Sequence, residues 1–176
     1  MDAGAVADCK RLCIESVDTS STVRSKVGQA VITLLERNLK ASLLGVLTLA
    51  PQNASLATQC RKIMKEDGAL DFAQPAASID ARLRAFTPWP GGYFDHGGTR
   101  VKVGKCSLVE PVTSAQPGSV IVAGENLDVA TGLGLLRIHE LQRPGGRMLP
   151  ASDFLRGYPI KVGEVLLSVP SHSLLV

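Results

Sequence analysis

The sequence lacks an apolar run long enough to cross a membrane. Its longest apolar stretch, residues 41–50, falls well short of the roughly 20 residues that a transmembrane helix needs. The N-terminal residues, which include Asp2 and Asp8, form neither a basic-then-apolar signal peptide nor an Arg- and Ser-rich transit peptide. We therefore expect no membrane partner for this chain, although a truncated sequence would say nothing about the leader of a longer parent.

Cysteine is scarce, and its spacing excludes the common metal motifs. The four cysteines are Cys9, Cys13, Cys60 and Cys106, and none belongs to a C-x-x-C pair. Two of them are four residues apart, which would place them on one face of a helix, but the local pattern favours a strand. We interpret all four as reduced thiols in a reducing compartment, and we expect no zinc or other metal site.

The chain also has no large excess of positive or negative charge. The 176 residues hold 19 Lys and Arg against 16 Asp and Glu, which gives a formal net charge of +3 and an isoelectric point near 8.8. Residues 1–75 contain nine basic and eight acidic side chains, and residues 76–176 contain ten and eight. A nucleic-acid surface must therefore come from the arrangement of basic side chains rather than from bulk charge.

The first fifty residues predict a strand and a long amphipathic helix. Residues 11–14 have a strand-like pattern, and D-T-S-S at residues 18–21 supplies side-chain oxygens that can cap a helix start. The helix that follows has about five turns, ends near Lys40 or Ala41, and carries one apolar face. That face consists of Val23, Val27, Ala30, Val31, Leu34 and Leu35. Because one strand and one helix cannot form a core, we interpret residues 1–49 as the remnant of a larger α/β domain.

The most informative stretch is R-A-F-T-P-W-P-G at residues 84–91, where a helical pattern ends and strands begin. Ile79, Leu83 and Phe86 recur at helical spacing, and the two prolines that follow end the helix. Trp89, the only tryptophan, lies between those prolines. We interpret its ring as a plug for one end of a barrel or sheet, with a base or ribose stacking on it as the alternative.

From Gly92 onward the pattern changes to short strands separated by turns, which is typical of a small closed or nearly closed barrel. We expect strands at residues 99–103, 119–123, 127–131, 135–141 and 161–166, and a short helix at residues 151–157. The predicted fold class is α+β. It comprises the α/β remnant, an extended linker at residues 50–75, and a small OB-like β-barrel domain at residues 76–176.

Three segments resemble methionyl-tRNA formyltransferases. The stretch at residues 84–91 resembles the junction where the linker of that family enters its C-terminal domain. Residues 62–72, with K-I-M-K-E-D-G followed by D-F, resemble the linker itself. Residues 141–157, ending in A-S-D-F-L-R-G, resemble the last signature of the family. The three segments occur in the family's order and cover most of residues 50–165.

The resemblance implies an enzyme that transfers a formyl group from 10-formyltetrahydrofolate to the amino group of methionyl initiator tRNA for translation initiation. In that family an Asn donates to the oxyanion, a His acts near the moving proton, and an Asp orients the His. Only Asp2 matches a position of this trio, because the other two residues and the folate-binding loop lie farther upstream in the family. We interpret Met1 as an internal methionine of a C-terminal piece, with a genuine short protein as the alternative. This chain alone is expected not to catalyse formyl transfer.

The resemblance also implies a basic surface that holds tRNA, built by the linker and the C-terminal domain. The candidates are Lys62, Lys65, Arg84, Arg100, Lys102, Lys105, Arg137, Arg143, Arg147 and Arg156. Binding of a phosphate backbone by such side chains depends on salt and only weakly on base identity. The expected partner is methionyl initiator tRNA and not DNA. His96, His139 and His172 have no nucleophile or carboxylate at a recognisable spacing, so we interpret them as solvated or structural.

Two further interpretations stay open. One is a free-standing RNA-binding barrel protein without catalysis, and the other is a different formyl-folate-dependent enzyme. The chain departs from the family pattern at Arg61, where a proline is common, and at Gly146, where a second basic residue is common. We expect a cytoplasmic location for a bacterial source and a mitochondrial or plastid location for a eukaryotic one. A monomer is expected, because no interface stripe appears beyond the helix face at residues 23–35.

Overall fold

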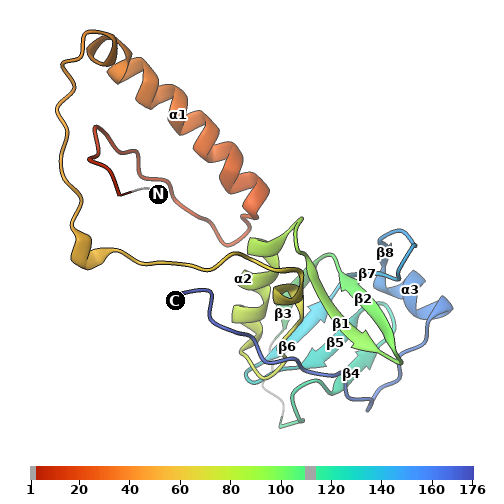
Figure 1. The fold of residues 1–176 in the computed structure, drawn as a ribbon. Helices are drawn as coiled ribbons and strands as arrows, with labels where there is room; N and C mark the ends of the chain where they lie inside the picture. Colours follow the sequence, from red (N-terminus) through yellow and green to blue (C-terminus); the bar gives the residue numbers. More distant parts are fainter. Residues whose placement is uncertain (1–2, 110–113) are drawn as a thin grey trace. The chain divides into compact units, whose positions relative to one another are not determined.

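The computed structural model describes residues 3–109 and 114–176, which fall into two compact units (Figure 1). The first unit is Met1–Lys62 with Leu174–Val176, and the second is Ile63–Ser173. Asp2, the one candidate catalytic residue, lies outside the described residues.

The first unit contains the long helix that the sequence predicts. Helix α1 (Ser20–Leu43) begins with a capping box, in which the Thr19 amide donates to Thr22 Oγ at 2.9 Å and the Thr22 amide donates back to Thr19 Oγ. Within α1 only Ala30 is buried, and on the predicted apolar face Leu35 is 55% exposed and Val27 and Val31 are each 44% exposed. The helix therefore presents an apolar face without a covering layer in this unit. A short 3₁₀ turn, η1 (Ala54–Leu56), follows it.

The predicted strand at residues 11–14 is wrong. That segment forms no strand within the described part of the chain, and its residues are exposed. A strand needs a neighbour to bond its backbone groups, and the described part of the first unit supplies only two isolated bridges, Val6–Ala50 and Cys60–Leu175, neither of which involves residues 11–14.

The described residues of the second unit form eight short strands and two α-helices. In order, its elements are η2 (Lys65–Gly68), α2 (Ala76–Phe86), β1 (Gly92–His96), β2 (Thr99–Val103), β3 (Cys106–Val109), β4 (Val120–Ala123), β5 (Leu127–Ala130), β6 (Leu135–Ile138), β7 (Glu140–Gln142), β8 (Leu149–Pro150) and α3 (Ala151–Gly157). The strands form two antiparallel sheets with the orders β1-β2-β7-β8 and β3-β6-β5-β4. Helix α2 lies against β3 and β6, and α3 lies against β7 and β8 (Figure 1). The mixed α+β class is confirmed.

The OB-like barrel stays a prediction, because the strand pairs found among the described residues divide into these two sheets rather than one ring. The strand predicted at residues 161–166 is wrong. This segment bonds its backbone to residues 118–120 and forms an isolated bridge between Ser119 and Val165, but it is not a strand. Gly163 has a φ of 89°, a left-handed conformation that turns the chain.

The core of the second unit lies between the sheets and the two helices. Ile79, Leu83 and Phe86 of α2 are buried, as their helical spacing predicts. Ile79 and Leu83 pack with side chains from both sheets, including Phe94 and Leu136. The glycine-rich turn at residues 132–134 lies very close to the segment before α2. A Cβ at Gly132 would lie 2.0 Å from the Ala73 carbonyl oxygen. Only glycine allows the segment before α2 to cross so close to the β5–β6 turn.

Trp89 does not plug either sheet, so that interpretation is wrong. Its side chain is 59% exposed, because it follows the last turn of α2 in a segment that leaves the core before β1 begins. The alternative, a base or ribose stacking on the ring, stays a prediction.

Replacing Leu136 with Ala should lower the free energy of unfolding by about 2–5 kcal/mol, because its side chain is fully buried and the cavity cannot fill completely. Leu108, the partner of Leu136 on β3, is 52% exposed and is a matched control that should cost about 1 kcal/mol or less. Urea unfolding of both variants checks this, and equal losses would contradict the assigned core.

Candidate nucleic-acid interface

Strand β2 places two candidate basic side chains on one face of the first sheet. Arg100 and Lys102 alternate with Val101 and Val103, which are buried in the core. Lys102 pairs with Gln142 of β7 across the sheet, so these two side chains share the outer face. The predicted alternation of β2 is confirmed.

The two basic residues of β2 differ in their surroundings. The Arg100 guanidinium lies 3.8 Å from the centre of the Tyr93 ring, and its Nε donates to Asp95 Oδ1 at 3.2 Å. The hydrogen bond with Asp95 raises the pKa of Arg100, so this cation is fixed in place and partly neutralised. Lys102 is exposed and makes no ion pair with any described residue, so its charge is available to a partner.

The β7–β8 hairpin carries two more candidates beside this face. Gln142 Nε2 donates to the Gly146 carbonyl at 2.5 Å and closes the loop. Arg143 is exposed, and its guanidinium carbon lies 6.0 Å from the centre of the Tyr158 ring. Arg147 is exposed in the same loop, so the hairpin adds positive charge next to the row of Lys102 and Gln142.

The second sheet holds Lys105 and Arg137, which have different roles. Arg137 donates to both carboxylate oxygens of Asp128, its cross-strand neighbour on β5, at 2.8 and 2.7 Å. Asp128 is 2% exposed, so Arg137 compensates a buried carboxylate. The hydrogen bonds to Asp128 raise the pKa of Arg137. Lys105 is exposed just before β3. Arg137 is therefore mainly a structural cation, whereas Lys105 is accessible.

The helices place Arg84 and Arg156 beside carboxylates. Arg84 Nε donates to Asp80 Oδ2 at 2.9 Å, and the same carboxylate accepts from the Cys106 thiol at 3.3 Å. Burial, followed by the nearby Asp80 charge, holds the pKa of this thiol far above its ordinary value. Arg156 pairs with Asp153 on the surface of α3.

The two linker candidates are exposed. Lys62 belongs to the first unit and Lys65 to the second.

Two histidines for which the sequence suggests no partner make specific hydrogen bonds in the structure. His96 Nε2 lies 2.8 Å from Glu164 Oε2, and this hydrogen bond lowers the pKa of Glu164. His139 contacts Ser107 and Asn126. The partners are up to 68 residues away in the chain, so only the tertiary fold shows them.

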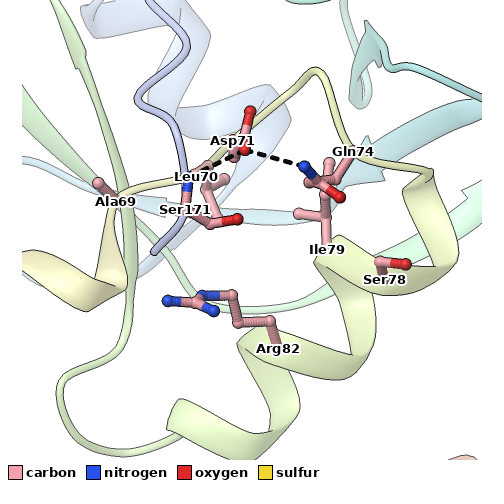
Figure 2. Close-up of a pocket in the computed structure, with 8 residues that line it drawn as sticks. All are labelled: Ala69, Leu70, Asp71, Gln74, Ser78, Ile79, Arg82 and Ser171. Atoms are coloured by element: carbon pink, nitrogen blue, oxygen red, sulfur yellow. Dashed lines mark hydrogen bonds between the residues drawn. The ribbon is translucent and has the colours of Figure 1, made fainter. Parts of the chain in front are cut away.

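A pocket of about 200 Å³ lies between the start of the second unit and α2 (Figure 2). It is lined by Ala69, Leu70, Asp71, Gln74, Ser78, Ile79, Arg82 and Ser171. Figure 2 shows the Asp71 carboxylate accepting from the Gln74 side chain and the Ser171 amide, and it also accepts from Ser168. Burial raises the pKa of Asp71, but these hydrogen bonds outweigh it and hold the pKa below its ordinary value. Asp71 therefore ties the C-terminal segment to the domain.

Among the described residues, 3–109 and 114–176, no group of three or more His, Cys, Asp or Glu side chains is placed to hold a metal ion. The same residues include no helix that is long and apolar enough to span a membrane.

The sequence is similar to proteins of known families. Residues 62–159 match the family described as formyl transferase, C-terminal domain. The chain is 36% identical over 166 residues to a methionyl-tRNA formyltransferase of Paraburkholderia phymatum, covering 93% of this chain and 51% of the relative. A methionyl-tRNA formyltransferase of Parvibaculum lavamentivorans is also 36% identical, over 93% of this chain and 54% of its own length. The chain thus spans about half the length of the curated relatives it matches.

Solved structures share the fold at lower identity. HypX from Aquifex aeolicus in complex with tetrahydrofolic acid matches with a TM-score of 0.66 and 18% identity, over 96% of this chain and 32% of HypX. A variant of the same protein matches with a TM-score of 0.67 and 20% identity, over 93% of this chain and 29% of that one.

Replacing Arg137 with Ala should lower the free energy of unfolding by about 3 kcal/mol, because it leaves the buried Asp128 carboxylate unpaired. Lys105→Ala, on the same face, is the control and should change it by about 0.5 kcal/mol or less. Adding Asp128→Asn to the Arg137 variant should recover part of the loss in urea unfolding. A loss no larger than that of the control would contradict the structural role of the pair.

Replacing Asp71 with Asn should destabilise the protein by about 1–3 kcal/mol at neutral pH, because the carboxylate accepts several hydrogen bonds. Since the folded pKa of Asp71 is lowered, its contribution is present above the ordinary value of 3.8 and is lost as pH falls through the folded pKa. The difference from the wild type should therefore shrink under acid conditions in urea unfolding. Asp153→Asn, at an exposed carboxylate, is the control, and a difference independent of pH would rule this role out.

Proposed function

Because the chain belongs to the family of formyl transferase C-terminal domains, we propose that it is the tRNA-holding portion of a methionyl-tRNA formyltransferase. The full enzyme would transfer a formyl group from 10-formyltetrahydrofolate to the amino group of methionyl initiator tRNA. The 36% identity to two enzymes of that name, over nearly the whole chain, supports this assignment. The lower identity to HypX, 18–20%, makes a different formyl-folate enzyme the weaker alternative.

The observation that carries a tRNA-holding role is the accessible positive charge on one side of the first sheet. Lys102 on β2 and Arg147 in the β7–β8 loop are exposed and make no ion pair with a described residue. Arg100 and Arg143 add planar guanidinium groups held beside aromatic rings. Phosphate oxygens are the natural partners for such a group, since charge-assisted hydrogen bonds to them need no particular base.

The remaining candidates extend this proposal. Lys65, Lys105 and Arg156 would widen the phosphate-binding surface, and Lys62 would contribute from the linker. Arg84 and Arg137, which bind carboxylates of the chain, would act mainly by positioning neighbouring groups.

The domain division is likewise proposed from the family. Residues 1–49 would be the end of the catalytic domain, residues 50–75 the linker, and residues 76–176 the C-terminal domain with its barrel-like pair of sheets. Asp2 would be the catalytic aspartate of the full enzyme, so this chain alone is expected to be inactive. The named relatives are bacterial, which favours the cytoplasm among the possible locations.

We expect the purified chain to bind initiator tRNA saturably in a filter-binding titration at about 50 mM salt, and far more weakly at about 200 mM. Lys102→Glu and Arg147→Glu should each weaken binding roughly fivefold or more at the lower salt, since each reverses a charge on the proposed surface. Lys161→Glu reverses an exposed charge outside the candidate set and is the matched control.

Three outcomes would count against the proposal. They are the absence of saturable binding at the lower salt, an affinity that does not change with salt, and a control variant that loses as much affinity as the other two. Saturable binding by a chain whose full-length gene carries no catalytic domain would instead support the free-standing RNA-binding protein.

A further inference from the structure

The outer face of the second sheet carries two adjacent rows of polar side chains. Ser107, Arg137 and Asp128 lie opposite one another on β3, β6 and β5. His139 follows β6, and its amide donates to the Lys105 carbonyl at 2.8 Å. The second row is therefore Lys105, His139 and Asn126, directly beside the first.

Hydrogen bonds connect the two rows through His139. Its Nδ1 lies 3.0 Å from Asn126 Oδ1, and its Nε2 lies 2.7 Å from Ser107 Oγ. An amide oxygen can only accept, so Nδ1 must carry a proton. In the neutral ring Nε2 is then an acceptor, and the Ser107 hydroxyl donates its hydrogen to it. In this state Ser107 offers an approaching anion no hydrogen-bond donor.

Protonation of His139 reverses the direction of the second hydrogen bond. Nε2–H then donates to Ser107 Oγ, and the hydroxyl hydrogen is free to point away from the ring. The same proton adds a positive charge next to Lys105, which is exposed. Both changes favour an anion, and both occur at one place on the surface.

We propose that Lys105, Ser107 and His139 form a proton-linked site for one backbone phosphate of tRNA. This inference rests on the proposed function, and it adds that the site accepts a proton when the phosphate binds. By linkage, a phosphate that prefers the protonated ring must be bound more tightly as pH falls.

The charges around His139 are compatible with this role. The Asp128 carboxylate is held by Arg137 on the adjacent row, so it does not compete for the imidazole. Glu140, the next residue, lies against Gly104, where a Cβ would be 2.7 Å from its Oε2. Glu125 is exposed in the turn before β5. At the start of α3 the Ala151 amide donates to the His139 carbonyl and adds no charge.

A serine–histidine–asparagine series also resembles the activated nucleophile of some hydrolases. The accessible Lys105 beside the series favours an anion site instead.

The test measures initiator tRNA affinity of the full 176-residue chain at about pH 6 and about pH 8, at fixed ionic strength. The wild type should bind several-fold more tightly at the lower pH. His139→Gln keeps an amide donor for Ser107 but does not titrate, so its affinity should be nearly equal at both values. His172→Gln, at the exposed histidine of the C-terminal segment, is the matched control and should keep the wild-type ratio.

Ser107→Ala is a second variant, for use if His139→Gln fails to fold by circular dichroism. It should lose more affinity at the lower pH than at the higher one, since only the protonated site uses its hydroxyl. Nitrogen NMR of the His139 ring gives a direct readout, with Nδ1–H in the free protein and protonation of both nitrogens on tRNA addition. Inorganic phosphate that produces the same change at matched concentration would assign the site to free phosphate and overturn the tRNA assignment.

The failures of the two proposals are distinguishable. Saturable, salt-dependent tRNA binding that is equal at both pH values, or that keeps its pH dependence in His139→Gln, overturns the proton-linked site alone. Absence of saturable binding at every pH overturns the tRNA-holding function and this site with it.

Discussion

The second unit depends on one continuous run, residues 135–142, which belongs to both sheets. Its first half is β6, in the centre of one sheet, and its second half is β7, in the other. Leu136, Ile138 and Leu141 of this run are fully buried, so the core is anchored where the chain passes between the sheets. The change of sheet occurs at His139, which breaks the strand and is half-buried on the outer face. Core and surface are therefore set by the same eight residues.

This arrangement sorts the basic side chains into two kinds. Arg137, on the run itself, compensates the buried carboxylate of Asp128, and Arg84 pairs with the partly buried Asp80 within α2. Lys102 and Arg147 flank β7 and have no acidic partner among the described residues. Formal charge alone, only +3 in total, would not separate these groups. Their positions in the sheet decide which charges stabilise the fold and which are accessible to a phosphate backbone.

Local sequence patterns predicted several elements of the fold. The capped start of α1, the apolar spacing of α2 and the alternation of β2 are short-range signals, and each matches the structure. The strand at residues 161–166 failed because its pattern ignores the turn at Gly163, and the strand at residues 11–14 failed because a strand also needs a neighbour. Trp89 shows the same limit, since size and flanking prolines do not say which side of a core a ring faces.

The sequence by itself determined the α+β class, the order of most elements, the three family-like segments and the set of basic residues from which a tRNA surface could be drawn. These follow from periodicity and short motifs, which depend on residues a few positions apart. Only the tertiary structure decided that Arg137 neutralises Asp128, that Asp71 holds the C-terminal segment, and that Ser107, His139 and Asn126 meet on one face. Those contacts join residues up to 100 positions apart, and their register is set by how the two sheets share a strand run rather than by any local pattern.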